Sequence, residues 1–257
     1  MDLQLSVALI QTSLFWQDPA KNRAWFSEKI RTIEKGADLI VLPEMFTTGF
    51  TMTPEATDKA EGIKTLQWMK FEARTTNAAV IGSIPFYENE QYTNRLFFVE
   101  PNGNYHYYDK RHTFTLAGEH LTYASGKELL VVDYKGFKIC PLICYDLRFP
   151  VWSRNTANYD ILLYVANWPK PRITAWDTLL KARAIENMAY CIGVNRIGKD
   201  ENNYEYVGHS ACYDALGTQM AFSTKDEVLN MVIKKEDLIT TRTKFRFLED
   251  KDNFTLQ

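Results

Sequence analysis

The sequence predicts an α/β fold in which helices cover mixed β-sheets, and two of its features support this prediction. Apolar segments of strand length alternate with segments of helix length along most of the 257 residues. Several pairs of these strands are also separated by turn residues that close antiparallel hairpins. Helix-linked strands favour parallel pairing and hairpins require antiparallel pairing, so we expect mixed sheets.

The first half of the chain contains three single strands, two helices and a hairpin. The expected strands are residues 5–10, 37–42 and 78–85. The expected helices are residues 22–35, with apolar positions at helical spacing, and residues 63–75. Pro101, Asn102 and Gly103 are a strong turn signal, which predicts a hairpin of residues 92–99 and 103–110.

The second half adds two hairpins, three strands and one helix. Lys135 and Gly136 predict a hairpin of residues 129–134 and 137–144. Gly217 predicts another, of residues 211–214 and 218–223. The remaining expected strands are residues 161–166, 190–197 and 227–233, and the remaining helix is residues 176–187.

The chain has no feature that divides it into separate units. We find no internal repeat, low-complexity tract or linker, so we expect residues 1–257 to form a single domain. The C-terminal tail, about residues 240–257, is charged and aromatic. We expect this tail to pack on the surface of the domain or on a partner subunit.

From the charge, the cysteine usage and the first residues, we expect that this protein does not belong to several common classes. The net charge of −2 leaves no electrostatic footprint for nucleic acid. A signal peptide pattern is missing, and no apolar stretch is long enough to span a membrane. The four cysteines form no CxxC pair, so we expect reduced thiols in a cytoplasmic protein. The four histidines lack ligand spacing, so we expect no metal and no cofactor.

Three predicted strands end in residues that carry chemistry: Glu44, Lys110 and Cys144. A cysteine with an ordinary pKa of about 8.5 needs a base or a nearby cation to act as a nucleophile. Glu44 supplies the base, and Lys110 supplies a positive charge that favours the thiolate and stabilises an oxyanion. The backbone N–H of Tyr145 is the natural second oxyanion donor. Each residue alone has an ordinary structural explanation, but together they indicate a hydrolytic site.

Three sequence blocks resemble the signature blocks of the nitrilase superfamily of carbon-nitrogen hydrolases. They are residues 42–44 (LPE), 109–112 (DKRH) and 142–150 (LICYDLRFP), and their order and separation match as well. The resemblance implies an α-β-β-α sandwich of two sheets, a Glu-Lys-Cys triad of Glu44, Lys110 and Cys144, and a homodimer or larger homo-oligomer. It also implies that Glu119 is a second glutamate, which orients the lysine or the substrate.

A closer resemblance, to the bacterial ω-amidase branch, rests on four segments, two of which overlap the blocks above. They are residues 110–114 (KRHTF), 144–154 (CYDLRFPVWSR), 164–169 (YVANWP) and 182–187 (ARAIEN). This branch hydrolyses the terminal amide of 2-oxo acids such as 2-oxoglutaramate and 2-oxosuccinamate. The resemblance therefore implies hydrolysis of small linear amides through a cysteine thioester.

The far end of such a substrate carries a carboxylate, which calls for an arginine or a lysine. Arg148, Lys170 and Arg172 are the candidates, and we favour Arg172 because it lies in an irregular proline-rich loop after a strand end. Asn167 and Trp168 are expected to shape the pocket wall, and Phe114 is expected to cover the pocket.

Three alternatives remain open at this point. The first is another nitrilase-type hydrolase with the same triad: a carbamoylase, an aliphatic amidase or a nitrilase. The second is a catalytically silent binding protein on the same fold. The third is a protease-like dyad of His112 and Cys144, for which the sequence gives no spatial support.

Overall fold

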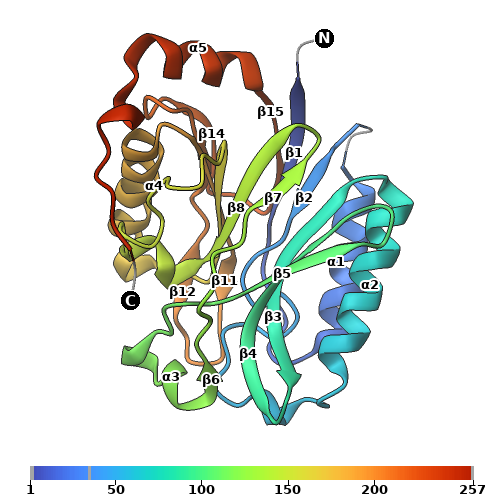
Figure 1. Ribbon diagram of the computed structural model, residues 1–257. Coiled ribbons are helices and arrows are strands. Elements are labelled where there is room, and N and C mark those ends of the chain that lie inside the picture. Colours follow the sequence, from blue (N-terminus) through green and yellow to red (C-terminus); the bar gives the residue numbers. More distant parts are fainter. Residues whose placement is uncertain (1–2, 34–35, 256–257) are drawn as a thin grey trace.

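The computed structural model describes residues 3–33 and 36–255, and it contains two mixed β-sheets packed face to face (Figure 1). Helices cover the outer face of each sheet. The predicted α/β class and the α-β-β-α sandwich are both confirmed.

The first sheet has the strand order β15-β1-β2-β3-β4-β5, with β6 paired to β4. Strands β1, β2 and β3 are parallel, and the other main pairs are antiparallel. The strands are β1 (Gln4–Gln11), β2 (Leu39–Val41), β3 (Ala79–Glu88), β4 (Gln91–Val99), β5 (Tyr105–Asp109), β6 (Tyr123–Ala124) and β15 (Glu227–Lys234).

The second sheet has the order β14-β13-β10-β9-β8-β7, with β8, β9 and β10 parallel. Its strands are β7 (Val132–Tyr134), β8 (Phe137–Ile143), β9 (Ile161–Ala166), β10 (Tyr190–Asn195), β13 (Ser210–Tyr213) and β14 (Gln219–Ser223). A small separate hairpin joins β11 (Ile197–Lys199) to β12 (Glu205–Val207).

Two long helices, α1 (Pro19–Arg31) and α2 (Glu61–Thr76), cover the first sheet, and α4 (Ile173–Asn187) covers the second. Gly193 of β10 allows α4 to approach closely, because a Cβ there would lie 2.6 Å from Leu180. The remaining helices are α3 (Glu119–Thr122), α5 (Lys235–Phe245) and five short 3₁₀ segments: Pro54–Ala56, Thr115–Ala117, Cys144–Arg148, Lys170–Arg172 and Phe247–Asp250.

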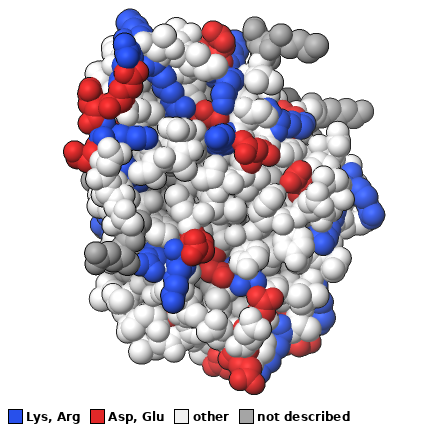
Figure 2. All heavy atoms as spheres, viewed as in Figure 1, with Lys and Arg blue, Asp and Glu red and all other residues white. Residues whose placement is uncertain are grey.

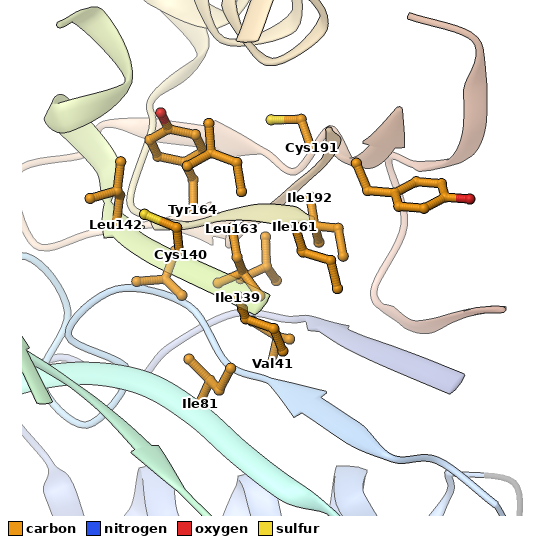
Figure 3. Close-up of a cluster of buried hydrophobic side chains, with 14 of the residues drawn as sticks. Val41, Ile81, Ile139, Cys140, Leu142, Ile161, Leu163, Tyr164, Cys191 and Ile192 are labelled. Atoms are coloured by element: carbon orange, nitrogen blue, oxygen red, sulfur yellow. The ribbon is translucent and has the colours of Figure 1, made fainter. Parts of the chain in front are cut away.

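The first sheet alternates its side chains between two buried surfaces. In β2, Leu39 and Val41 face the second sheet, whereas Ile40 packs under the helices. Figure 3 shows Val41 and Ile81 against Ile139 of the facing sheet. Because both faces are buried, these strands read in the sequence as nearly continuous apolar runs.

Most predicted elements exist, but several boundaries were wrong. The helix expected at 22–35 begins at Pro19, because the Asp18 side chain accepts a hydrogen bond from the Lys21 N–H and caps it. It ends at Arg31, and residues 34–35 lie outside the described residues. The strand expected to end at Pro85 continues to Glu88, because β2 accompanies β3 only over residues 79–81 and leaves Pro85 with one neighbouring strand.

Other element boundaries also differ from the prediction. Residues 129–131 are not a strand, and the strand expected at 190–197 stops at Asn195, before the separate β11. The helix expected at 176–187 begins at Ile173. The tail includes part of the unpredicted helix α5, whose Arg242 donates hydrogen bonds to the backbone oxygens of Met188 and Tyr159.

Charged side chains of both signs are interspersed on the face drawn in Figure 2, around a broad uncharged centre. No continuous basic patch is visible on this face. Within residues 3–33 and 36–255, no helix is both long enough and apolar enough to cross a bilayer.

Candidate active site

The site lies where strands of both sheets end. Glu44 follows β2 and Lys110 follows β5 in the first sheet, whereas Cys144 follows β8 in the second. The carboxyl ends of β8, β9 and β10 lie together because these strands are parallel. The fold therefore brings together three residues that are 34 to 100 positions apart in the chain.

Lys110 is fully buried between two carboxylates. Its Nζ lies 2.8 Å from Glu44 Oε1 and 3.0 and 2.9 Å from the two carboxylate oxygens of Glu119. The Asn94 side-chain amide donates to the same two carboxylates, at 2.9 and 3.1 Å. The structure thus places Glu119 directly against the lysine, with its Oε2 accepting a hydrogen bond from the Phe114 N–H at 2.5 Å.

The charges in this cluster shift each other's ionisation. Burial by itself lowers the pKa of Lys110, but the carboxylates of Glu119 and Glu44 outweigh burial and raise the pKa overall. Burial raises the pKa of Glu119, and Glu44 raises it further, while Lys110 opposes both. Lys110 is therefore a permanent cation at neutral pH.

Cys144 sits on a sharp turn, with a positive φ of 44° at the first residue of a 3₁₀ segment. A cysteine rarely adopts this conformation, and it turns the side chain out of the strand direction. The thiol donates to the Asn167 backbone oxygen at 3.9 Å, and the Asn167 N–H donates to Glu44 Oε2 at 2.9 Å. The thiol and the Glu44 carboxylate therefore share Asn167 as a neighbour.

Burial raises the pKa of the Cys144 thiol well above its usual range, and the nearby Glu44 carboxylate raises it further. Lys110 lowers this pKa, as expected, but its effect is smaller than the other two. The prediction that the positive charge of Lys110 favours the thiolate therefore agrees with the direction in which Lys110 shifts this pKa. Because the thiol pKa is raised, we expect that formation of the thiolate requires a base.

A cavity of about 750 Å³ opens over Cys144 and Lys110. Asn167, Trp168 and Phe114, which were predicted to shape or cover the pocket, line this cavity. The two candidate arginines, Arg148 and Arg172, line it as well, and so does Tyr145. The backbone N–H of Tyr145 lies in the first turn of the 3₁₀ segment, where amides have no partner within the turn.

Two arginines stand at the cavity, each against an aromatic ring. The guanidinium of Arg172 lies 5.1 Å from the centre of the Phe114 ring, and that of Arg148 lies 4.9 Å from the Trp168 ring. Neither has a carboxylate within 4.0 Å in the part of the chain that the structure describes. Lys170, by contrast, pairs with Glu205 at 2.8 Å on the surface and does not line the cavity.

Sequence reasoning missed two residues of the site, Asn94 and Asp146. Both are fully buried and polar. Asn94 lies between Thr93 and Arg95 in the polar first half of β4, so its residue type and neighbours gave no signal of a buried site residue. Asp146 lies two residues after Cys144, and its residue type alone predicted no role in the site.

The His112–Cys144 dyad is wrong as a structural alternative. The His112 ring nitrogen Nδ1 lies 2.8 Å from Asp146 Oδ1, and the ring stacks on Phe149 with the centroids 3.7 Å apart. No cluster of three or more metal-ligating side chains occurs among residues 3–33 and 36–255. The side chains that the structure brings together are a thiol, a buried ammonium and two buried carboxylates.

Comparison with known proteins identifies the family. The family model described as carbon-nitrogen hydrolase matches residues 6–243. The chain belongs to this family. It is 42% identical to Omega-amidase YafV of Escherichia coli K12 over 254 residues, which is 98% of each chain.

Two further relatives support the assignment. The chain is 32% identical to 2-oxoglutaramate amidase of Bacillus subtilis, over 88% of each chain. It also matches the crystal structure of a carbon-nitrogen hydrolase superfamily protein from Xanthomonas campestris that carries an arsenic adduct in its active site. That match has a TM-score of 0.95 and 39% identity, over 100% of both chains. The predicted nitrilase superfamily membership is confirmed.

Proposed function

We propose that this protein is an ω-amidase, which hydrolyses the terminal amide of short 2-oxo acid amides such as 2-oxoglutaramate and 2-oxosuccinamate. One observation carries the proposal: a buried thiol and a buried lysine held between two carboxylates share a cavity with two arginines that have no carboxylate partner among the described residues. The names of the relatives from Escherichia coli and Bacillus subtilis agree with it.

The first half of the reaction forms a thioester. Glu44 takes the proton of the Cys144 thiol, and the sulfur attacks the amide carbonyl carbon. Lys110 Nζ and the Tyr145 N–H stabilise the oxyanion that forms. Glu44 then gives the proton to the amide nitrogen, the carbon–nitrogen bond breaks, and ammonia leaves the acyl group on Cys144.

The second half consumes water and restores the thiol. Glu44 takes a proton from water, and the hydroxide attacks the thioester carbonyl carbon. The carbon–sulfur bond breaks, Glu44 returns the proton to sulfur, and the 2-oxo dicarboxylate leaves. Glu119 holds Lys110 in place throughout, because both of its oxygens contact the ammonium.

The cavity wall supplies contacts for both ends of the substrate. Arg172 binds the carboxylate at the far end through charge-assisted hydrogen bonds, and Arg148 is a second cation lining the same cavity. The side-chain oxygen Oδ1 of Asn167 is buried and has no hydrogen-bond partner in the described part of the chain. It is available to accept a hydrogen bond from the substrate amide. Trp168 and Phe114 form apolar walls between these polar ends.

Ammonia release by the purified protein tests the proposal. The substrates are 2-oxoglutaramate, 2-oxosuccinamate, glutamine, a carbamoyl amino acid and a simple nitrile, with Cys144→Ala as the control. Rapid release from the two oxo-amides alone, abolished in the variant, supports the ω-amidase. Release only from another substrate retains the triad and replaces the substrate class. Silence on all of them, with an unreactive Cys144, supports a binding protein.

We also propose a cytoplasmic homodimer or larger homo-oligomer. Four free, buried cysteines suit a reducing compartment. Strands β14 and β15 and helix α5 expose large apolar side chains, including Met220, Val232 and Ile239. Light scattering on the purified protein measures the assembly, and a monomer at micromolar concentration would contradict it.

A further inference from the structure

The Asp146 carboxylate, two residues after Cys144, is a buried acceptor for donors from two parts of the chain. Its Oδ2 accepts from the Tyr108 hydroxyl at 2.8 Å and from the Ile143 N–H at 3.1 Å. Its Oδ1 accepts from the His112 N–H at 2.9 Å and lies 2.8 Å from His112 Nδ1. Two of these donors come from His112 and one from the last residue of β8.

These contacts join the segment that carries the lysine to the turn that carries the nucleophile. Tyr108 lies two residues before Lys110, and His112 lies two residues after it. Lys110 comes from the first sheet and Cys144 from the second, so no backbone ladder fixes their separation. The Asp146 carboxylate therefore connects the nucleophile turn to residues that precede and follow Lys110 in the chain.

The donors are themselves held in place. The Tyr108 hydroxyl accepts hydrogen bonds from Trp152 Nε1 at 3.0 Å and from the Arg111 N–H at 3.1 Å. The His112 ring stacks almost parallel on Phe149, with an interplanar angle of 4°. Asp146 does not line the cavity, so it has no direct contact to offer a substrate there.

We propose that Asp146 is a positioning residue, which fixes the Cys144 thiol relative to the Lys110 ammonium through Tyr108 and His112. The inference rests on the proposed function of Cys144 as the nucleophile. A loss of this support acts on the chemical step, because misplacement of reacting groups by about 1 Å costs about 100-fold in rate. Substrate affinity depends on the cavity wall and is left nearly unchanged.

The test compares two pairs of variants. Tyr108→Phe removes a hydroxyl bonded to Asp146, and Tyr190→Phe removes a hydroxyl bonded to the Lys234 backbone oxygen, at the opposite end of β10 from the site. His112→Asn retains a side-chain N–H donor for Asp146, and His112→Ala removes it. Asp146→Asn alters the acceptor itself. For each variant, kcat, KM, Tm and the rate of Cys144 alkylation by iodoacetamide are measured.

We expect Asp146→Asn to lower kcat about 100-fold with KM changed less than about threefold. Tyr108→Phe and His112→Ala lower kcat about tenfold, whereas Tyr190→Phe and His112→Asn stay within about threefold of the wild type. The rate of Cys144 alkylation by iodoacetamide should differ from the wild-type rate in the same variants that lose kcat. This readout uses no amide substrate, so it does not depend on the choice of substrate.

Two results would overturn the inference. The first is a change in KM with kcat unchanged. The second is an equal loss of kcat in Tyr108→Phe and Tyr190→Phe that parallels their loss of Tm. Failure of the proposed function looks different, because the wild type then releases no ammonia from any oxo-amide.

Discussion

The two ends of the cavity hold their charges in opposite ways. At the inner end, Lys110, Glu44 and Glu119 are fully buried, and the ammonium contacts both carboxylates. At the outer end, Arg148 is exposed and Arg172 is half-buried, and each lies against an aromatic ring. The inner charges already have partners, whereas neither outer arginine forms an ion pair within 4.0 Å among the residues that the structure describes.

This difference separates the reaction from the choice of substrate. A buried ion pair with full hydrogen bonding is rigid, because breaking it leaves an uncompensated charge. Such a cluster suits groups whose positions must stay fixed during the reaction. A guanidinium on an aromatic surface is desolvated on one face and still free to bind a carboxylate. Such a group suits recognition.

The largest expected effect is loss of the base at the inner end. Glu44→Gln should lower kcat by about 10³- to 10⁴-fold, because an amide side chain cannot carry out the proton transfers proposed for this carboxylate. The same variant removes a negative charge that raises the pKa of Cys144. The pH profile of Cys144 alkylation should therefore move to lower pH even though turnover is lost. Glu128→Gln, at an exposed position, is the control. If the pH profile of Cys144 alkylation does not move in Glu44→Gln, the assignment of Glu44 is contradicted.

Loss of the inner cation should affect stability as well as turnover. Lys110→Met leaves two buried carboxylates unpaired, which should lower the free energy of unfolding by about 3–5 kcal/mol at neutral pH. Because the pKa of Lys110 is raised in the folded protein, its contribution to the free energy of unfolding is complete at any pH below the ordinary lysine pKa. This contribution is lost only as the pH rises through the higher pKa of the folded state. Chemical denaturation measured across pH tests this.

The matched control for that experiment is Lys135→Met. Lys135 pairs with Asp38 on the surface and is 43% exposed in its side chain. Its loss should change the free energy of unfolding by less than about 1 kcal/mol. Equal losses in the two variants would mean that the inner cluster is no more rigid than a surface ion pair.

Loss of an outer cation should change the preference between charged and uncharged substrates and leave the reactivity of Cys144 unchanged. Arg172→Ala should raise KM for 2-oxoglutaramate about tenfold or more, because a hydrogen bond to a charged group contributes about 1.5–3 kcal/mol. Uncharged amides should be unaffected. Alkylation of Cys144 by anionic iodoacetate should slow, whereas alkylation by neutral iodoacetamide should not. Equal losses on charged and uncharged substrates would remove Arg172 from carboxylate binding.

The smallest effect is expected at Lys170, the neighbouring cation outside the cavity. Lys170→Ala breaks only a surface pair with Glu205, whose side chain is 47% exposed. Both KM and kcat should stay within about twofold, because such exposed pairs contribute about 0–1 kcal/mol. A large rise in KM would show that the carboxylate site extends further along this loop.

Much of the fold was predictable because its signals are local. The strand at Ile161–Ala166 was predicted with its correct ends, since an apolar run between polar residues has few other interpretations. The prediction that the strand ends at Pro85 was wrong. The effect of a missing proline N–H on a sheet depends on which strands lie beside it, and this is not visible in the sequence. Helix α5 was missed, because few of its side chains are buried and its apolar periodicity is weak.

The sequence by itself determined the class of the fold and the chemical identity of the site. It supplied Glu44, Lys110 and Cys144 at strand ends, which is a matter of residue type and local order. Only the tertiary structure decided that Lys110 sits between two carboxylates and that Asp146 joins the lysine segment to the nucleophile turn. It also decided that Arg172 faces the cavity while Lys170 faces solvent. These outcomes depend on contacts between residues far apart in the chain, and a sequence pattern carries no distances.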